Sequence, residues 1–377
     1  MRTIQIVNVR WFNATAWYGL WLAKLLQGAG HETLVITLPG TANWEKAEEF
    51  GFKPQFLPFN SRNPLAFPSL YCRLRKLVRQ FRPDIINCHR GEGFIACALL
   101  REELKNFGLI RTRGDQRLPK TNLPNLIMHK RMADAVIATN SRMADFFLQK
   151  MGLPPAQVHT ILGGVDTAVF NFDAAGRAAV RAEFGLADND FVIGLLGRYD
   201  QVKGHRDLLA AVALLRRRGQ AGNLKIMFIG HPCPHFPEEK LRTYAAELGV
   251  ADLVRYTGRR ADIAACISAL DAGVVASLWS EAIARAALEI MACSRPLLGS
   301  TVGVMPDLLP AAAMYPPGDL EALAQLLCTV QQDEQFRREL LLHQEKQLRG
   351  LSPQMFLSAT LQVYEQALLK VRGQNPG

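Results

Sequence analysis

Residues 271–292 decide how this chain folds, and they read DAGVVASLWSEAIARAALEIMA. The run Asp271–Ser277 is short and apolar with turn residues around it, which is typical of a buried strand in a parallel sheet. The later residues are mostly Ala, Leu, Glu and Met, which favour helix, and Ser280 is suited to cap its first turn. We therefore predict a strand, a short loop and a helix, with Glu281 at the helix start and Glu289 about two turns into it.

This predicted arrangement suggests a ligand. A helix start beyond the carboxyl end of a parallel strand is where phosphates bind in open α/β sheets. Two carboxylates repel phosphate, but they accept hydrogen bonds from sugar hydroxyls, and a nucleotide sugar carries hydroxyls on both sides of its diphosphate. The alternative for two glutamates eight residues apart is a solvated helix face.

Length and charge limit the possible classes of protein. A chain of 377 residues, 49% hydrophobic and 21% charged, fits two folded domains. Residues 1–170 hold 22 Lys+Arg against 12 Asp+Glu, whereas residues 171–377 hold 22 of each, so the first half carries the whole net charge of +10. A basic half indicates an anionic partner, namely nucleic acid, an anionic membrane or a charged glycolipid, or it serves only solubility.

Cysteine spacing and hydropathy indicate the compartment. Seven scattered cysteines without a C-x-x-C pair argue against a disulfide framework or a zinc ribbon, and for a reducing compartment. The first nine residues alternate like a strand and lack the long apolar region of a signal peptide. No uncharged apolar run is long enough to span a membrane. We expect a cytoplasmic protein, with peripheral contact on the inner membrane face as an option.

The first half reads as a doubly wound sheet with charged residues at its strand ends. Residues 1–9 predict a strand, the loop that follows contains Asn13 and Thr15, and a helix to about residue 29 leads to a strand at 31–37. A basic helix at 73–82 precedes PDIINCH at 83–89, a strand that ends at His89. A lone histidine there is either a structural side chain or a group facing a ligand.

A second strand end in this half is rich in arginine. Arg111 and Arg113 stand where they would meet phosphate on a donor or acceptor, or would form a loop salt-bridge cluster with Asp115.

The second half begins with GRYDQVKG at 197–204, after an apolar strand. Arg198 offers a planar fork and Lys203 a point charge to phosphate oxygens, although a surface basic pair is the simpler alternative. Asp188-Asn189-Asp190 has the D-x-D spacing of metal-dependent transferases but falls in a turn before a strand. The loop HPCPH at 231–235 lacks a fourth ligand nearby. We expect no metal and no cofactor.

Together these motifs resemble retaining glycosyltransferases of family 4, which have the GT-B fold. The resemblance rests on Glu281 and Glu289 as an E-x7-E pair, on GRYDQVKG, on PDIINCH, on GGVDTAVF at 163–170 and on PGDLEAL at 317–323. It implies α/β architecture with two Rossmann-like domains facing across a cleft, and a C-terminal helix that crosses back to the first domain. The domains would be 1–165 with 353–377, and 166–352.

The resemblance also implies roles for individual residues. Glu289 would hold the nucleotide ribose, Glu281 would contact the donor sugar near the reacting centre, and Arg198 with Lys203 would clamp the diphosphate. Ala282 and Ile283 would complete the donor site, and His89 would reach toward the donor sugar. The family usually has paired glycines in its first loop near donor and acceptor; Asn13 and Thr15 stand there instead and become acceptor or phosphate candidates, with Arg111 and Arg113.

The expected function is metal-independent, retaining transfer of a hexose or related sugar from a nucleoside-diphosphate sugar to an anionic acceptor. The expected class of acceptor is an envelope glycolipid or lipopolysaccharide core saccharide. The alternatives are a nucleotide-sugar epimerase of the same fold and a non-catalytic protein that binds anionic ligands or nucleic acid. The sequence contains no nucleic-acid recognition motif, so we expect no nucleic-acid partner.

Overall fold

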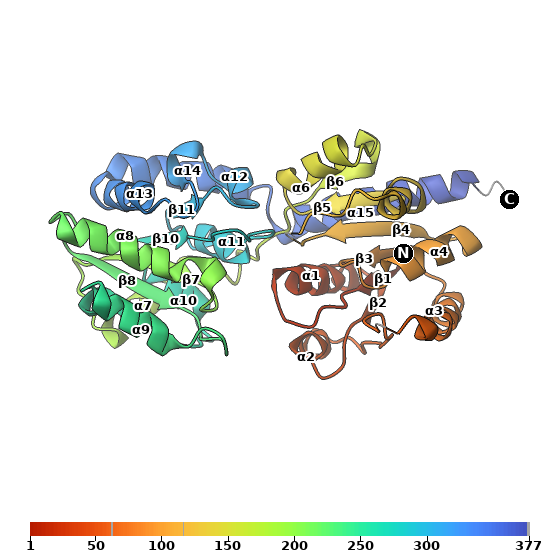
Figure 1. Cartoon of the computed structure of the whole chain (residues 1–377), viewed down its shortest axis with the longest axis horizontal. Helices are drawn as coiled ribbons and strands as arrows, with labels where there is room; N and C mark the ends of the chain where they lie inside the picture. Colours follow the sequence, from red (N-terminus) through yellow and green to blue (C-terminus); the bar gives the residue numbers. More distant parts are fainter. Residues whose placement is uncertain (62, 116, 375–377) are drawn as a thin grey trace. The chain divides into compact units, whose positions relative to one another are not determined.

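A computed structural model describes residues 1–61, 63–115 and 117–374. The chain divides into two compact units (Figure 1). Unit 1 comprises residues 1–163 together with the last helix, and unit 2 comprises Gly164–Ser352. Within unit 2, the first and last segments are joined by a hydrogen bond from the Val165 amide to the Leu351 carbonyl at 2.9 Å.

Unit 1 is built on a parallel sheet in the order β2-β1-β3-β4-β5-β6. Its strands are β1 (Arg2–Ile6), β2 (Glu32–Ile36), β3 (Ile85–Cys88), β4 (Gly108–Arg113), β5 (Ala135–Ala138) and β6 (Val158–Thr160). Its helices are α1 (Ala14–Gly28), α2 (Ala42–Glu49), α3 (Phe67–Phe81), α4 (Phe94–Leu104), α5 (Leu123–Ile127), α6 (Ser141–Asp145) and α15 (Pro353–Gln374), with short turns η1 (Pro64–Ala66), η2 (Met128–Met132), η3 (Phe146–Lys150) and η4 (Pro155–Gln157).

Unit 2 is built on a second parallel sheet, in the order β12-β11-β10-β7-β8-β9. Its strands are β7 (Phe191–Leu196), β8 (Leu224–Ile229), β9 (Val254–Tyr256), β10 (Ala272–Val275), β11 (Leu297–Ser300) and β12 (Met314–Tyr315). Its helices are α7 (Ala174–Glu183), α8 (His205–Arg217), α9 (Glu238–Glu247), α10 (Ile263–Ser268), α11 (Arg285–Ala292), α12 (Met305–Leu308), α13 (Leu320–Gln332) and α14 (Glu334–Leu348), with η5 (Gln201–Lys203), η6 (Ala251–Leu253) and η7 (Ala311–Ala313).

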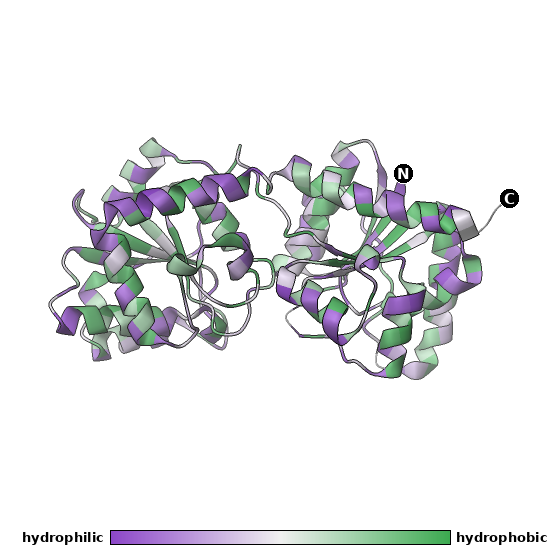
Figure 2. Cartoon of the chain, turned by 90° about the horizontal axis from the view of Figure 1, so that it is seen from above, coloured by the Kyte–Doolittle hydropathy of each residue, from purple (hydrophilic) through white to green (hydrophobic). Residues whose placement is uncertain are grey.

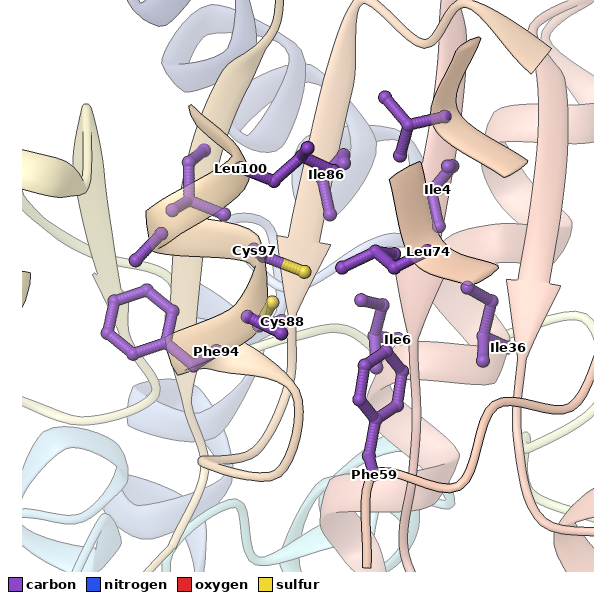
Figure 3. Packing of buried hydrophobic residues seen from close by; sticks show 14 of the residues in the cluster. Ile4, Ile6, Ile36, Phe59, Leu74, Ile86, Cys88, Phe94, Cys97 and Leu100 are labelled. Atoms are coloured by element: carbon purple, nitrogen blue, oxygen red, sulfur yellow. The ribbon is translucent and has the colours of Figure 1, made fainter. Parts of the chain in front are cut away.

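Each sheet forms the middle layer of its unit, with helices on both faces (Figure 1). Strands buried on both faces read as continuous apolar runs, and every residue of β3 and of β10 is buried. Coloured by hydropathy, the strands are mainly apolar while the helices turn polar sides outward (Figure 2). In unit 1, Ile4 and Ile6 of β1 pack with Leu74 of α3 and with the neighbouring thiols of Cys88 and Cys97 (Figure 3). The predicted α/β fold with two Rossmann-like sheets is confirmed.

The last helix belongs to unit 1, as predicted. Helix α15 packs on β4 and α1, and its Tyr364 hydroxyl accepts hydrogen bonds from Asn87 Nδ2 at 2.9 Å and Gln5 Nε2 at 3.2 Å. Residues 375–377 of the predicted C-terminal segment lie outside the described residues. Within the part that is described, no helix combines the length and apolar character needed to cross a bilayer.

The helix that follows β10 begins later than predicted. Residues 280–283 form a loop, Ala284 is left-handed at φ 46°, and α11 starts only at Arg285. The Glu281 carbonyl accepts from the Val304 amide at 2.8 Å, a tertiary partner in place of the Arg285 amide that a helix would supply. Glu281 therefore precedes the helix, and Glu289 lies one turn into it. The basic helix predicted at 73–82 begins earlier than predicted, because α3 starts at Phe67.

Candidate functional site

The strand order of unit 2 fixes where its ligand site should be. Strands β7 and β10 are neighbours although they are not consecutive, so their following connections leave the sheet in opposite directions. Ligands of open α/β sheets bind in the crevice at such a switch point, outside the carboxyl ends of the strands. The loop after β7 carries Arg198 and Lys203, and the loop after β10 carries Ser277 and Glu281.

Lys203 and Glu281 bridge these two loops. The Lys203 ammonium donates to Glu281 Oε2 at 2.7 Å, and the Ser277 hydroxyl donates to the same oxygen at 2.5 Å. Glu281 is buried, whereas the Lys203 side chain is 28% exposed. A buried carboxylate is costly unless it is paired, and these two donors satisfy it. The cation of this pair is therefore partly exposed, whereas its carboxylate is buried.

Two glycines allow the loops to approach this closely. A Cβ on Gly204 would overlap the Ala276 carbonyl, and a Cβ on Gly303 would overlap the Glu281 carbonyl. Both glycines are left-handed, at φ 72° and 63°, a region that glycine adopts without steric cost. The position of Glu281 thus depends on the absence of side chains at two points of the chain.

Glu289 lies on α11, buried, with its Oε1 accepting from Arg285 Nε at 2.5 Å. Burial raises its pKa, and the Arg285 charge opposes this effect. A carboxylate has acceptor capacity for about four hydrogen bonds, so one arginine contact leaves room for ligand hydroxyls.

The remaining donor-site candidates differ in accessibility. The Arg198 side chain is 48% exposed and donates to Asp200 Oδ2 at 2.6 Å. Ile283 is buried and Ala282 half-buried, and both lie in the loop rather than at a helix start as expected. The residues Asp188–Asp190 form the predicted turn. Within residues 1–61, 63–115 and 117–374, no cluster of three or more His, Cys, Asp or Glu could hold a metal ion.

The candidate site residues of unit 1 mostly form contacts with other residues of that unit. His89 follows β3 and has no exposed surface, because Gly19 and Tyr18 of α1 pack against its ring. Its Nε2 is 2.9 Å from Gln5 Oε1, an acceptor, so Nε2 carries the proton. Burial, helped by the Arg111 charge, lowers the pKa of His89 to about 3. The imidazole is therefore neutral, and it faces the strands rather than solvent.

Asn13 and Thr15 hold the first turn of α1. Asn13 is the N-cap and accepts from the Ala16 amide at 3.0 Å. The Thr15 hydroxyl is buried and donates to the Gly114 carbonyl at 2.8 Å. Asn13 thus caps α1, and Thr15 ties α1 to the loop after β4.

Arg111 and Arg113 come together with Arg90 around Asp115, at the carboxyl ends of β3 and β4. Sequence reasoning named Asp115 as a partner of these arginines but missed Arg90, and it missed Ser277 beside Glu281. The only signal for Arg90 is that it follows His89 at a strand end; Ser277 has no recognisable spacing.

Two family models match different parts of the chain. The model described as Glycosyltransferase Family 4 matches residues 18–169, and the one described as Glycosyl transferases group 1 matches residues 190–333. D-inositol 3-phosphate glycosyltransferase of Saccharomonospora viridis is 28% identical over 72% of this chain and 64% of its own length. The MMP alpha-(1->4)-mannosyltransferase of Mycolicibacterium hassiacum is 27% identical over 65% of this chain and 57% of its own length.

A solved structure has the same fold. The structure of Anabaena HepE in complex with UDP and glucose superposes with a TM-score of 0.82 over 97% of this chain and 99% of its own, at 18% identity. The aligned region spans less than two thirds of the two curated relatives named above. The two family models fall on unit 1 and unit 2 respectively, in the order that the motifs predict. This chain belongs to the group 1 glycosyltransferases of family 4 and has the GT-B fold.

Proposed function

We propose that this chain transfers a sugar from a nucleoside-diphosphate sugar to an anionic acceptor, with retention at the anomeric carbon and without a metal ion. The observation that carries the proposal is the Lys203–Glu281 pair at the switch point of unit 2, a cation at the surface with a buried carboxylate behind it.

Charge development explains why such a pair suits this reaction. When the bond between the sugar and the diphosphate breaks, its electron pair stays on the leaving oxygen. Lys203 has three N–H donors and Glu281 uses one of them, so two remain for phosphate oxygens. Fixed donors of this kind stabilise the growing negative charge without a metal. Glu281 then faces the positive charge that develops at the anomeric carbon.

The other residues complete the donor site. The exposed guanidinium of Arg198 adds a second cation for the diphosphate. Glu289 accepts the ribose hydroxyls. Ala282 and Ile283 supply the loop beside the diphosphate. Support comes from HepE, whose structure contains UDP and glucose, and from relatives named as a D-inositol 3-phosphate glycosyltransferase and an MMP alpha-(1->4)-mannosyltransferase.

A screen in two stages tests the function. UDP, GDP and ADP are first compared for thermal stabilisation of the protein, and sugars of the stabilising nucleotide are then offered with mixed saccharide acceptors. We expect release of the nucleoside diphosphate, a product with the donor's anomeric configuration by proton NMR, and full activity in EDTA. Loss of activity in EDTA with rescue by Mg²⁺ or Mn²⁺ would contradict metal independence.

The alternatives give different products. An epimerase would change the nucleotide sugar without releasing the diphosphate. A non-catalytic protein would release nothing, and salt-sensitive retention of RNA would then indicate a nucleic-acid partner.

The basic charge of unit 1 supports an anionic acceptor, for which an envelope glycolipid or lipopolysaccharide core saccharide is the class we propose, reached from the inner membrane face. Arg73 and Lys76 are exposed on α3, whereas Arg75 and Arg79 pair with Glu103. Leu65, just before α3, is 85% exposed. Basic residues beside an exposed apolar side chain favour an anionic bilayer, with about 1 kcal/mol for each Lys or Arg near the surface.

Co-sedimentation with vesicles tests this contact. We expect binding to anionic but not neutral vesicles at low salt, and weaker binding at high salt because the Debye length shortens. The double variant Arg73→Gln/Lys76→Gln should lose most of it. Equal, negligible binding to both vesicle types would exclude the membrane contact and leave a soluble acceptor.

A further inference from the structure

We propose that unit 1 contains an anion seat, formed by Arg90, Arg111 and Arg113 around Asp115, that binds the phosphate or equivalent acid group of the acceptor. The assignment of the ligand as the acceptor rests on the proposed function; the binding of an oxyanion at these residues does not.

The three guanidinium groups converge on one carboxylate without bonding to it closely. Arg90 Nε lies 3.7 Å from Asp115 Oδ1, Arg111 Nη2 lies 3.7 Å from Oδ2, and Arg113 Nη1 lies 3.6 Å from Oδ2. Hydrogen bonds from a guanidinium to a carboxylate are about 2.7–2.9 Å long. Asp115 is thus a counter-ion for all three arginines but a close hydrogen-bond partner for none of them.

Buried donors in the seat remain unsatisfied. The Arg111 side chain is 1% exposed, and its Nη1 is held by the carbonyls of Cys88 and Thr112 at 2.8 and 2.5 Å. Its Nη2, which faces Asp115, has no hydrogen-bond partner among the described residues, and the same is true of Arg113 Nε. Unsatisfied buried donors are rare in folded proteins, and a charged one is especially costly. An oxyanion is the acceptor that these atoms lack.

The charge balance also favours an anion. Within the seat, Arg90, Arg111 and Arg113 face Asp115 and Glu92, the latter accepting from Arg90 Nε at 3.1 Å, so one positive charge is left over. Burial, followed by the Arg113 charge, lowers the pKa of Arg111 to about 10. This direction shows that the cluster crowds positive charge in a poorly solvated place, which a bound anion would relieve.

The seat lies where the fold places ligands. In the sheet of unit 1, β1 and β3 are neighbours at the switch point, and β4 follows β3. Arg90 follows β3, and Arg113 ends β4. The hydrogen bond from Thr15 to the Gly114 carbonyl joins the loop after β4 to the first turn of α1. The positive end of the α1 dipole lies at this turn and adds to the positive potential of the seat. The Asp115, Arg113 and Arg90 side chains are 18%, 12% and 32% exposed, so an anion can reach them.

Phosphate fits these donors because its several oxygens accept from planar guanidinium forks. The donor diphosphate is assigned to Lys203 and Arg198 in unit 2, so the group that binds here belongs to the acceptor. A soluble sugar phosphate and a lipid headgroup offer the same chemistry.

Calorimetry with inorganic phosphate and glucose 6-phosphate, at constant ionic strength, tests the seat. We expect binding to the full chain that weakens at least tenfold in Arg90→Gln and in Arg113→Gln. Arg131→Gln is the matched control, because Arg131 is an exposed arginine of unit 1 that precedes β5 and so lies at the amino ends of the strands, whereas the seat lies at their carboxyl ends. Equal affinity in all four proteins, or no binding to the unsubstituted chain, would overturn the proposal.

Asp115→Asn supplies an independent test. If the incoming anion takes over the guanidinium groups that Asp115 now neutralises, removing this competing charge should strengthen phosphate binding at least threefold. Weaker phosphate binding in Asp115→Asn would show that the anion does not replace Asp115 as the partner of the three arginines.

Further arms identify the source of the phosphate and separate this proposal from the proposed function. Vesicles containing phosphatidic acid that bind in an Arg113-dependent way indicate a lipid headgroup, whereas Arg113-dependent binding of glucose 6-phosphate alone indicates a soluble acceptor. UDP, GDP and ADP affinities are measured on the same proteins and should not change in Arg113→Gln. Arg113-dependent phosphate binding without any nucleotide binding would sink the transferase proposal but leave the seat intact.

Discussion

The two units place charged and polar side chains at equivalent points of their sheets, but they use them differently. In unit 2 the loops after β7 and β10 bring a half-accessible lysine onto a buried glutamate, and glycines at 204 and 303 make room for the contact. In unit 1 the loops after β1 and β3 contain Asn13, which caps a helix, and His89, which bonds inward to Gln5. The switch point in the strand order predicts where a ligand binds. Whether the side chains there are already hydrogen-bonded within the protein decides which of them can contact that ligand.

The difference assigns different work to the two units. Unit 2 presents a partly exposed cation, whereas Asn13, Thr15 and the Nε2 atom of His89 in unit 1 are engaged by contacts within the fold. Two unsatisfied buried donors of unit 1, Arg111 Nη2 and Arg113 Nε, lie one strand further along, beside Asp115. We therefore expect substitutions in unit 2 to affect nucleotide chemistry, and substitutions at His89 to affect mainly the stability of the fold.

The largest expected effect comes from Lys203→Ala. Losing a fixed donor to a developing negative charge typically costs 10²–10³ in rate, or about 2.7–4 kcal/mol. UDP, GDP or ADP affinity should also fall, with a smaller loss in the exposed Arg198→Ala. Calorimetry and initial rates provide the measurement. Since Lys203 also neutralises Glu281, circular dichroism must show a folded protein; unchanged affinity in both variants would refute the diphosphate assignment.

Gly204→Ala should come next. Its methyl group would overlap the Ala276 carbonyl and would also occupy a left-handed backbone position. Overpacking and positive φ together should lower the free energy of unfolding by roughly 2–4 kcal/mol, as measured by urea titration. Gly185→Ala is the control: Gly185 is also left-handed, at φ 59°, but its Cβ would meet nothing within 4 Å. It should lose only about 1–2 kcal/mol. Equal losses of unfolding free energy in Gly204→Ala and Gly185→Ala would mean that the close contact between Gly204 and the Ala276 carbonyl does not contribute to stability.

Much of the site's arrangement follows from local sequence. Apolar runs and turn residues predict β7, β10 and the start of α8, and the rule for parallel sheets then brings Lys203 and Glu281 to one edge. The sequence does not predict that residues 280–283 leave the helix, because Ala and Ile are no obstacle to helix. The Glu281 carbonyl instead accepts from the Val304 amide, a partner that lies 23 residues further along the chain.

His89 shows a similar limit in unit 1. A histidine at a strand end can face a ligand or the interior, and the choice depends on Gln5 and Tyr364, which lie in the first strand and the last helix. These contacts join positions separated by 84 and 359 residues, so no local pattern in the chain reports them. Arg90 escaped prediction for the same reason, since its partner Asp115 comes from the next strand end.

Within unit 2, substitutions of the two glutamates should have different effects on nucleotide affinity and turnover. Glu289→Gln weakens acceptance of ribose hydroxyls and should reduce nucleotide affinity about tenfold, which corresponds to about 1.4 kcal/mol. Glu281→Gln should lower turnover with little change in nucleotide affinity, because the reacting sugar lies on its side of the diphosphate. Calorimetry with the nucleoside diphosphate, combined with kcat and KM, distinguishes the two. The same pattern in both variants would contradict the division of roles.

A pH series of unfolding measurements tests whether His89 is enclosed, and therefore whether the switch points of the two units differ. Burial holds the pKa of folded His89 at about 3, against 6.5 in an unfolded chain. Above pH 6.5 both states are neutral and the histidine has no pH-dependent effect. Between pH 6.5 and 3 the unfolded chain binds a proton that the folded chain refuses, so its stability falls by at most about 1.4 kcal/mol per pH unit. His89→Gln should therefore flatten the loss of stability between pH 6 and 4, measured by urea titration, whereas His235→Gln, on the surface of unit 2, should not. If the slope is the same with and without His89, the ring is solvated and chargeable, and the switch point of unit 1 is as open to ligands as that of unit 2.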